Sequence, residues 1–272
     1  MLKQFIRLPN ERHAIKEATI SLFFGSVFVD LPQLAETIKG ALSSVFELTE
    51  LLHRQQVEVR VEGPFPNPNL TTNLAEPDVT GVRASRLHDG RPHRVLQLLN
   101  EEERVSLSLH NLHYDRWDDF LTLFEEVTQS LAPRLANMVV VGCGLHYVDE
   151  LAWTHPTMPL PLEQIYQANP AYLPDRFFES AASELLLTVP STCGNVHYFD
   201  RLHVTSLSNN QPVATISHNL VHQFDEQRDL TALQKQPNAL RHVLQQAHEQ
   251  NKLVLRAILQ PEIRFLIKLD AS

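Results

Sequence analysis

Two long amphipathic stripes, each following several strand-like segments, restrict the fold of this sequence more than any other feature. The first recurs at helical spacing and comprises Trp117, Phe120, Leu121, Phe124, Val127 and Leu131. The second runs from Asn238 to about Leu259 and comprises Leu240, Val243, Leu244, Ala247, Val254, Leu255 and Ile258. Because an amphipathic stripe must be buried against another layer, the sequence predicts that each helix covers one face of a sheet.

Segments with strand patterning surround both stripes. Residues 17–29, 57–62 and 138–148 are predicted strands of the first part, and residues 184–189, 196–207 and 212–224 are predicted strands of the second. Between residues 79 and 111 the pattern indicates an antiparallel meander with a turn at Asp89-Gly90. Pro261 is expected to stop the second helix, and residues 263–269 are predicted to form a final strand.

Local signals predict where several elements begin and end. Asp30, followed by Pro32 and Gln33, predicts a helix start, and apolar spacing extends this helix to Leu52. Residues 63–78 are rich in Pro and Asn and predict a loop. Asp115 is a predicted cap for the helix of the first stripe, and Pro133 should end or kink that helix.

These elements predict an α+β fold with two similar halves, each an antiparallel sheet covered by a long amphipathic helix. The predicted N-terminal half covers residues 1–153 and the C-terminal half residues 162–272. The Pro-rich residues 154–161 are the predicted connection. The similarity between the halves is one of element order and not of sequence.

Composition excludes several classes of protein. The formal charge of −9 disfavours a protein that coats nucleic acid, although a local basic groove is compatible with it. The eight glycines complete neither a dinucleotide-binding nor a P-loop motif, so no cofactor is expected. The two cysteines cannot form a disulfide framework, and no apolar run is long enough to cross a bilayer. Without a signal-peptide pattern, the expected location is the cytoplasm, with no membrane partner.

A histidine cluster is the main candidate for catalysis. His218 and His222 lie four residues apart and therefore on one face of a predicted strand, and His203 and Thr205 lie on the preceding strand. A strand with histidine followed by a threonine two residues later is half of a two-histidine phosphoesterase pattern, in which histidines act as acid and base. The alternative is an ordinary polar sheet face, and no metal-binding signature is completed.

A locally basic stretch is the candidate for nucleic-acid binding. It comprises Arg83, Arg86, Arg91 and Arg94 in the predicted meander. Phosphate binding is one interpretation, and a solvent-exposed hairpin that happens to carry arginines is the other.

The chain resembles a sporadically distributed family of uncharacterised bacterial proteins of about this length, which has no assigned activity. The matching segments are AIKEATISLFF, LHYDRWDDFLTLFEEV, VVVGCGLHYVDEL, YQANPAYLP and LRHVLQQAHEQNKLVLRAIL, in the family's order over nearly the whole chain. The family's strand usually reads arginine-tyrosine-hydrophobic-asparagine where this chain has residues 146–149. The resemblance implies no catalytic residue, and the family's patchy occurrence suits an accessory or phage-defence system.

Three functional hypotheses follow from the sequence. The first is a non-enzymatic cytoplasmic binding or assembly component with a protein partner or a homo-oligomeric state. The second is a histidine-dependent phosphoesterase or RNA-processing enzyme that uses His203, Thr205, His218 and His222. The third is a nucleic-acid-binding module that uses the four arginines.

Overall fold

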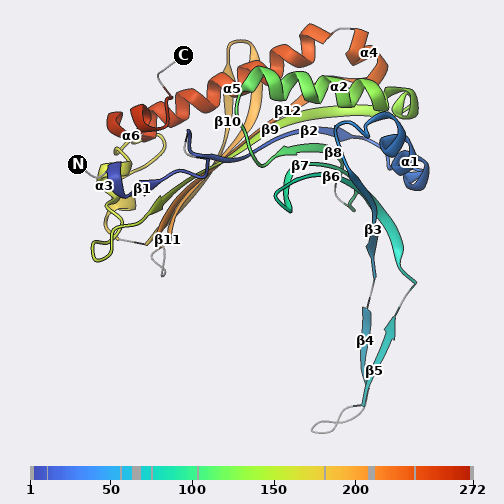
Figure 1. Ribbon diagram of the computed structural model, residues 1–272, viewed down its shortest axis with the longest axis horizontal. Helices are drawn as coiled ribbons and strands as arrows, with labels where there is room; N and C mark the ends of the chain where they lie inside the picture. The colour runs from blue at the N-terminus through green and yellow to red at the C-terminus, as the bar shows by residue number, and fades with distance from the viewer. Residues whose placement is uncertain are drawn as a thin grey trace.

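The computed structural model describes residues 3–10, 12–55, 57–62, 69–74, 76–102, 104–180, 182–207, 212–235 and 237–269. Its main feature is one large antiparallel sheet, which has ten strands in the described part of the chain (Figure 1). The order across the sheet is β10 (Ser183–Cys193), β11 (Val196–Leu207), β12 (Val213–Asp229), β9 (Val139–Trp153), β2 (Ile15–Phe24), β8 (Val105–Asn111), β7 (Arg91–Asn100), β6 (Asp78–His88) and β3 (Leu48–Arg54). The short strand β1 (Ile6–Arg7) pairs with the end of β9.

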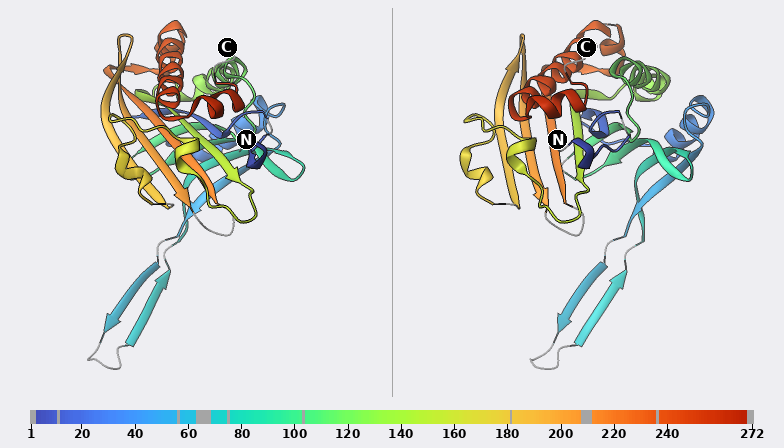
Figure 2. Two further views of the ribbon diagram at one scale, coloured as in Figure 1. Left: turned by 90° about the vertical axis from the view of Figure 1, so that its left-hand side faces the viewer. Right: turned by 60° about the vertical axis from the view of Figure 1, so that its left-hand side comes forward.

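Helices cover one face of this sheet. The two long helices, α2 (Trp117–Leu135) and α5 (Pro237–Ile258), lie side by side on the same face (Figures 1 and 2). The shorter helix α1 (Leu31–Ala41) packs beside β3 and β6. The remaining helical pieces are η1 (Lys3–Phe5), α3 (Leu162–Ile165), η2 (Asp175–Phe178), α4 (Leu230–Lys235) and α6 (Pro261–Leu266).

The prediction of two halves, each with its own sheet under its own helix, is wrong. β2 pairs with β9 and β9 pairs with β12, so the strands before and after the predicted connection form one sheet. β9 extends to Trp153 and has hydrogen-bonded neighbours on both sides, as a central strand does. An amphipathic stripe shows that a helix has a buried face, but it contains no information about which strands lie beneath it.

A separate two-stranded sheet extends beyond the ends of β3 and β6. It consists of β4 (Val57–Glu62) and β5 (Asn69–Leu74), which pair with each other and with no other strand of the described chain (Figure 1). The strand at residues 57–62 is therefore confirmed. The predicted loop is wrong for residues 69–74, which form β5, while residues 63–68 and 75 lie outside the described residues.

Two predictions from local chemistry are confirmed. Asp30 accepts a hydrogen bond from the backbone N–H of Gln33 at 3.0 Å and so caps α1. Asp89 and Gly90, at the turn between β6 and β7, have φ angles of 49° and 73°. Both are positive, as the Asp-Gly signal for a tight hairpin requires.

Other local predictions need correction. α1 ends at Ala41, and Leu48 and Leu52 belong to strand β3. Residues 263–269 form no strand, because Pro261 begins α6 instead of only ending α5. Asp115 does not cap α2: the residue at the cap position is Arg116, and it makes no capping side-chain hydrogen bond. α2 also continues past Pro133 to Leu135.

The buried core lies between the sheet and the helices. One large apolar cluster packs α2 and the first part of α5 against the middle of the sheet, with Phe120, Leu145 and Leu244 among its members. A second cluster surrounds Trp153 and Tyr166 near the end of α5. Among the described residues, no helix has the length and apolar character that crossing a membrane requires.

Candidate functional site

The structure places the four candidate catalytic residues on both faces of the sheet. His203 and Thr205 alternate along β11 with buried Leu202, Val204 and Ser206, so they lie on the face without helices. His203 Nε2 lies 2.7 Å from the Glu184 carboxylate, and both side chains are substantially exposed.

His218 lies on the opposite, helix-covered face. It is fully buried, with Nε2 2.8 Å from Asp200 Oδ1 and Nδ1 2.9 Å from Asn251 Oδ1. The residue opposite His203 on β12 is Ser217, and residues opposite each other on antiparallel strands share a face. The next residue, His218, therefore points away from His203, and the sheet separates the two imidazoles.

His222 occupies a third environment. It shares the helix-covered face with His218, in agreement with their spacing of four residues, but its Nδ1 donates to the carbonyl oxygen of His197 at 2.8 Å. Its ring contacts Tyr198 and Phe224. The described residues include no group of three or more His, Cys, Asp or Glu side chains that is arranged to hold a metal ion.

The four candidate arginines likewise do not form one surface. Arg83 lies on the other face of β6 from buried Ala84, and Glu50 lies 3.9 Å from it. Arg86 donates to the carbonyl oxygen of Ser44 at 2.8 Å and is directly opposite Arg94 on the neighbouring strand. Arg91 is exposed beside the turn. Arg86 and Arg94 therefore share one face of the sheet, and Arg83 lies on the other, so the four arginines do not all lie on one face.

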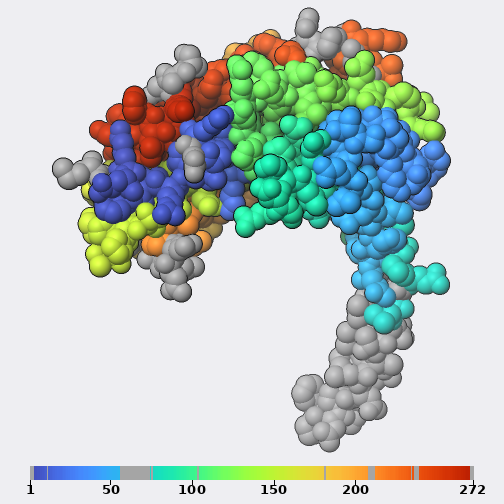
Figure 3. Space-filling view, in the orientation of Figure 1, coloured from blue at the N-terminus to red at the C-terminus, as the bar shows by residue number. Residues whose placement is uncertain are grey.

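The structure instead contains a cleft with a volume of about 680 Å³. Five segments line it: the residues that precede and begin β2, the start of α2, β9, the second half of α5, and the residues that follow α6. The lining residues are Arg12, His13, Ala14, Ile15, Tyr114, Asp115, Arg116, Trp117, Asp149, His248, Asn251, Lys252, Leu255, Ile267, Lys268 and Leu269. In Figure 3 the N-terminal segment (blue) lies against the start of α2 (green) and against the last helices of the chain (red) on the face in view.

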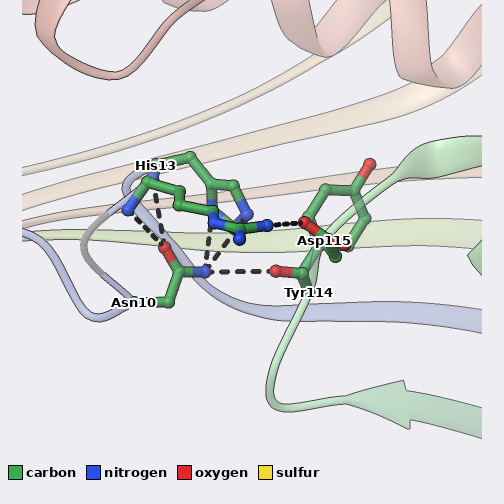
Figure 4. Close-up of polar contacts among 5 residues, drawn as sticks. Asn10, His13, Tyr114 and Asp115 are labelled. Atoms are coloured by element: carbon green, nitrogen blue, oxygen red, sulfur yellow. Dashed lines mark hydrogen bonds and ion pairs between the residues drawn. The ribbon is translucent and has the colours of Figure 1, made fainter.

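Hydrogen bonds tie the N-terminal segment to the start of α2 (Figure 4). The Asn10 amide donates to the carbonyl oxygen of Tyr114 at 3.1 Å, and its Oδ1 accepts from the His13 backbone N–H at 3.0 Å. Arg12 pairs with Asp115 at 3.0 Å. The His13 ring packs edge-on against Tyr114, and burial is the main cause of its lowered pKa. This wall of the cleft is therefore held in place by contacts between distant parts of the chain.

A buried chain of hydrogen-bonding rings forms the back of the cleft. The Tyr114 and Tyr147 hydroxyls are hydrogen-bonded, and Tyr147 Oη lies 2.9 Å from His248 Nδ1. The His248 ring stacks on Trp117, with ring centroids 4.5 Å apart and planes at 9°. Burial lowers the pKa of His248 to about 3, with a further contribution from the charge of Lys252. His248 is consequently neutral at physiological pH.

Asp149 is the group of this cleft with an unmet hydrogen-bonding requirement. Its side chain is buried, with 2% of the residue exposed, and Oδ2 has no hydrogen-bond partner among the residues that the structure describes. Burial raises the pKa of this carboxyl to about 7, and the charge of His218 only partly opposes the change. Leaving a buried polar atom unpaired costs about 1–3 kcal/mol, so an unpaired carboxylate oxygen in a residue that lines a cleft points to a missing donor.

The sequence contains a signal for this site that the histidine and arginine patterns do not include. In β9 the positions facing the helices carry Leu145, Tyr147, Asp149 and Leu151, so a carboxylate falls on the buried side of an alternating strand. Alternation could therefore have singled out Asp149 as a buried acid. It could not have shown that residues near 12, 115, 250 and 268 come together around it. No protein-family model matches the chain, and no curated protein matches it either.

Proposed function

We propose that the protein is a binding protein and that its ligand is a small polar molecule held in the cleft between β2, β9, α2 and α5. The observation that carries this proposal is Asp149, whose buried Oδ2 faces no donor of the described chain while the residue lines an open cleft. A bound molecule with a hydroxyl or amino group would supply the missing hydrogen bond.

The shape and lining of the cleft support the proposal. Its volume of about 680 Å³ lies in the range of ordinary small-molecule sites. Apolar walls from Ile15, Leu255 and Ile267 surround a few placed polar groups, which is the usual composition of a ligand pocket. Such a site fits the non-enzymatic binding role expected from the sequence, but at residues other than the histidines and arginines first considered.

Tryptophan fluorescence provides a direct test, because the chain has two tryptophans and one of them, Trp117, lines the cleft. Trp153 lies in the second apolar cluster, where its indole donates to the Met158 carbonyl oxygen. In the Trp153→Phe variant, Trp117 is the only tryptophan. We expect at least one compound from a panel of anionic, neutral and cationic polar molecules to change its emission and to raise the melting temperature.

The control is the reciprocal variant, Trp117→Phe, in which Trp153 reports on a region away from the cleft. Its emission should stay constant with the same compounds. The proposal fails if no compound of any charge class alters both the emission of Trp117 and the melting temperature of the protein.

A further inference from the structure

We propose that the cleft selects a small molecule with an oxyanion, phosphate or carboxylate, at one end and a hydroxyl or amino group at the other. Lys252, Lys268 and Arg116 would hold the oxyanion, and Asp149 would accept the hydrogen bond from the other end. This inference rests on the proposed function, because it names the ligand class of the same cleft.

The balance of charge in the cleft argues for an anionic group. Four lining residues are Arg or Lys, whereas two are acidic, in a chain whose formal charge is −9. Arg12 already pairs with Asp115, and Lys252 lies 3.4 Å from Glu249. The described residues supply no ion pair for Arg116 or Lys268. Concentrated positive charge at the wall of a cleft attracts anions.

The start of α2 adds a second attraction for an anion. Its cap residue, Arg116, makes no capping hydrogen bond, and residues 114–117 line the cleft. The first backbone N–H groups of a helix lack partners within the helix and carry partial positive charge. The carboxylates of the first turn, Asp118 and Asp119, are not among the residues that line the cleft.

The buried carboxyl of Asp149 argues for a second, donor-bearing end. Phosphate or carboxylate alone would leave Oδ2 unpaired and would place like charges together in the same cleft. An ammonium or hydroxyl group would pair with Oδ2 and, if charged, would favour ionised Asp149. A ligand therefore needs both an oxyanion for the basic residues and a hydrogen-bond donor for Asp149.

Lys268 provides an informative variant because glycine suits its backbone conformation. The substitution therefore removes the charged side chain without straining the backbone. It has φ of 58°, in the left-handed region, which is unfavourable for residues other than glycine. Lys268→Gly should therefore keep or raise the melting temperature while removing one cation from the cleft. A loss of affinity in this variant cannot be attributed to unfolding.

Isothermal titration calorimetry of the full chain with four small probes tests the inference. O-phosphoethanolamine and β-alanine carry an oxyanion and an amine, ethyl phosphate carries only the anion, and ethanolamine lacks the anion. We expect the better of the two bifunctional probes to bind at least about tenfold more tightly than ethyl phosphate and ethanolamine, because each charge-assisted contact is worth about 1.5–3 kcal/mol. A preference for O-phosphoethanolamine would identify phosphate, and a preference for β-alanine would identify carboxylate.

Two variants complete the test. Lys268→Gly should lower the affinity for the bifunctional probe by about fivefold or more. Asp149→Asn should lower that affinity to within about twofold of the affinity for ethyl phosphate. The inference is overturned if ethanolamine binds as tightly as the bifunctional probes, if none of the four binds, or if neither variant weakens the binding of the bifunctional probe. In each of these cases the proposed function stands if another compound of the fluorescence panel changes the Trp117 emission and the melting temperature. The proposed function fails only if no compound of that panel changes both.

Discussion

His218 and Asp200 form a buried pair, with Nε2 of the imidazole 2.8 Å from Oδ1 of the carboxylate. They lie on neighbouring strands beneath α5, and Asn251 of that helix contacts the other imidazole nitrogen. Burial alone would raise the pKa of Asp200, but the hydrogen bond and charge of His218 hold it below its ordinary value. The pair thus joins β11, β12 and α5 through groups that cannot exchange their partners for water.

Replacing His218 by alanine should destabilise the protein strongly. The change removes the partner of a carboxylate that has 4% side-chain exposure, and breaking a buried pair from one side costs about 3–5 kcal/mol. Urea unfolding at pH 7 measures this loss as a lower midpoint. His203→Ala is the matched control, because the His203–Glu184 pair is solvent-exposed and such pairs contribute about 0–1 kcal/mol. Equal losses in the two variants would contradict the assignment of His218 to the buried layer.

Asp149 should make the protein less stable as the pH rises towards neutrality. Its pKa in the folded state is about 7, above the ordinary value of 3.8, so between these values the folded chain holds a proton that the unfolded chain releases. Above pH 7, each unit by which the folded-state pKa exceeds the ordinary pKa lowers the free energy of unfolding by about 1.4 kcal/mol. The titratable groups that interact with this carboxyl through charge are His218 of β12, Tyr114 before α2, Tyr147 of β9 and Tyr166 after α3. Asp115, His248 and Lys252 line the same cleft.

The Asp149→Asn variant isolates this contribution. Relative to wild type, it should gain stability as the pH rises from 4 to 8, and the difference should level off above about pH 7. Unfolding free energies measured in urea across this range provide the comparison. A difference between variant and wild type that does not change with pH would show that the carboxyl is ionised at the same pH in both folded and unfolded chains.

His248 should make the protein less stable as the pH falls into the acidic range, which is the opposite of the effect of Asp149. Its folded-state pKa of about 3 lies below the ordinary value of 6.5, so the unfolded chain binds more protons between these values. Stability from neutral His248 is fully present above pH 6.5 and is lost as the pH falls. His248→Asn should reduce this loss, as measured by melting temperature between pH 4 and 7. Tyr147→Phe removes the hydroxyl bonded to His248 but no group that titrates in this range, so it should lower stability without removing the slope.

Two glycines offer a test of the packing of the sheet. A Cβ at Gly142 in β9 would lie 2.6 Å from the backbone carbonyl oxygen of His222 in β12. Gly142→Ala should therefore cost about 1–3 kcal/mol, because the obstruction is backbone and cannot move without disturbing the ladder. At Gly40 in α1 a Cβ would meet nothing within 4 Å, so Gly40→Ala should stabilise by about 0.5–1 kcal/mol. Thermal or urea unfolding distinguishes the two, and a neutral Gly142→Ala variant would rule out this close approach of β9 and β12.

Elements were predictable where the signal is local. The Asp30 cap, the Asp89-Gly90 turn and the strand at residues 196–207 each depend on neighbours in the chain, and all three are confirmed. Apolar spacing failed at Leu48 and Leu52, because leucines recurring every four residues satisfy both a helix stripe and one face of a strand. For the same reason the histidine spacing showed that His218 and His222 share a face, but not that His203 lies across the sheet from them.

The sequence by itself determined which face of each strand and helix is apolar, because side-chain periodicity follows from backbone geometry alone. Only the tertiary structure decided which elements those faces meet. The pairing of β2 with β9 joined the strands into one sheet, and the packing of α2 and α5 on one face placed Asp149 in the same cleft as Lys252 and Lys268. Contacts between residues more than one hundred positions apart depend on the packing of whole layers, which no local period encodes.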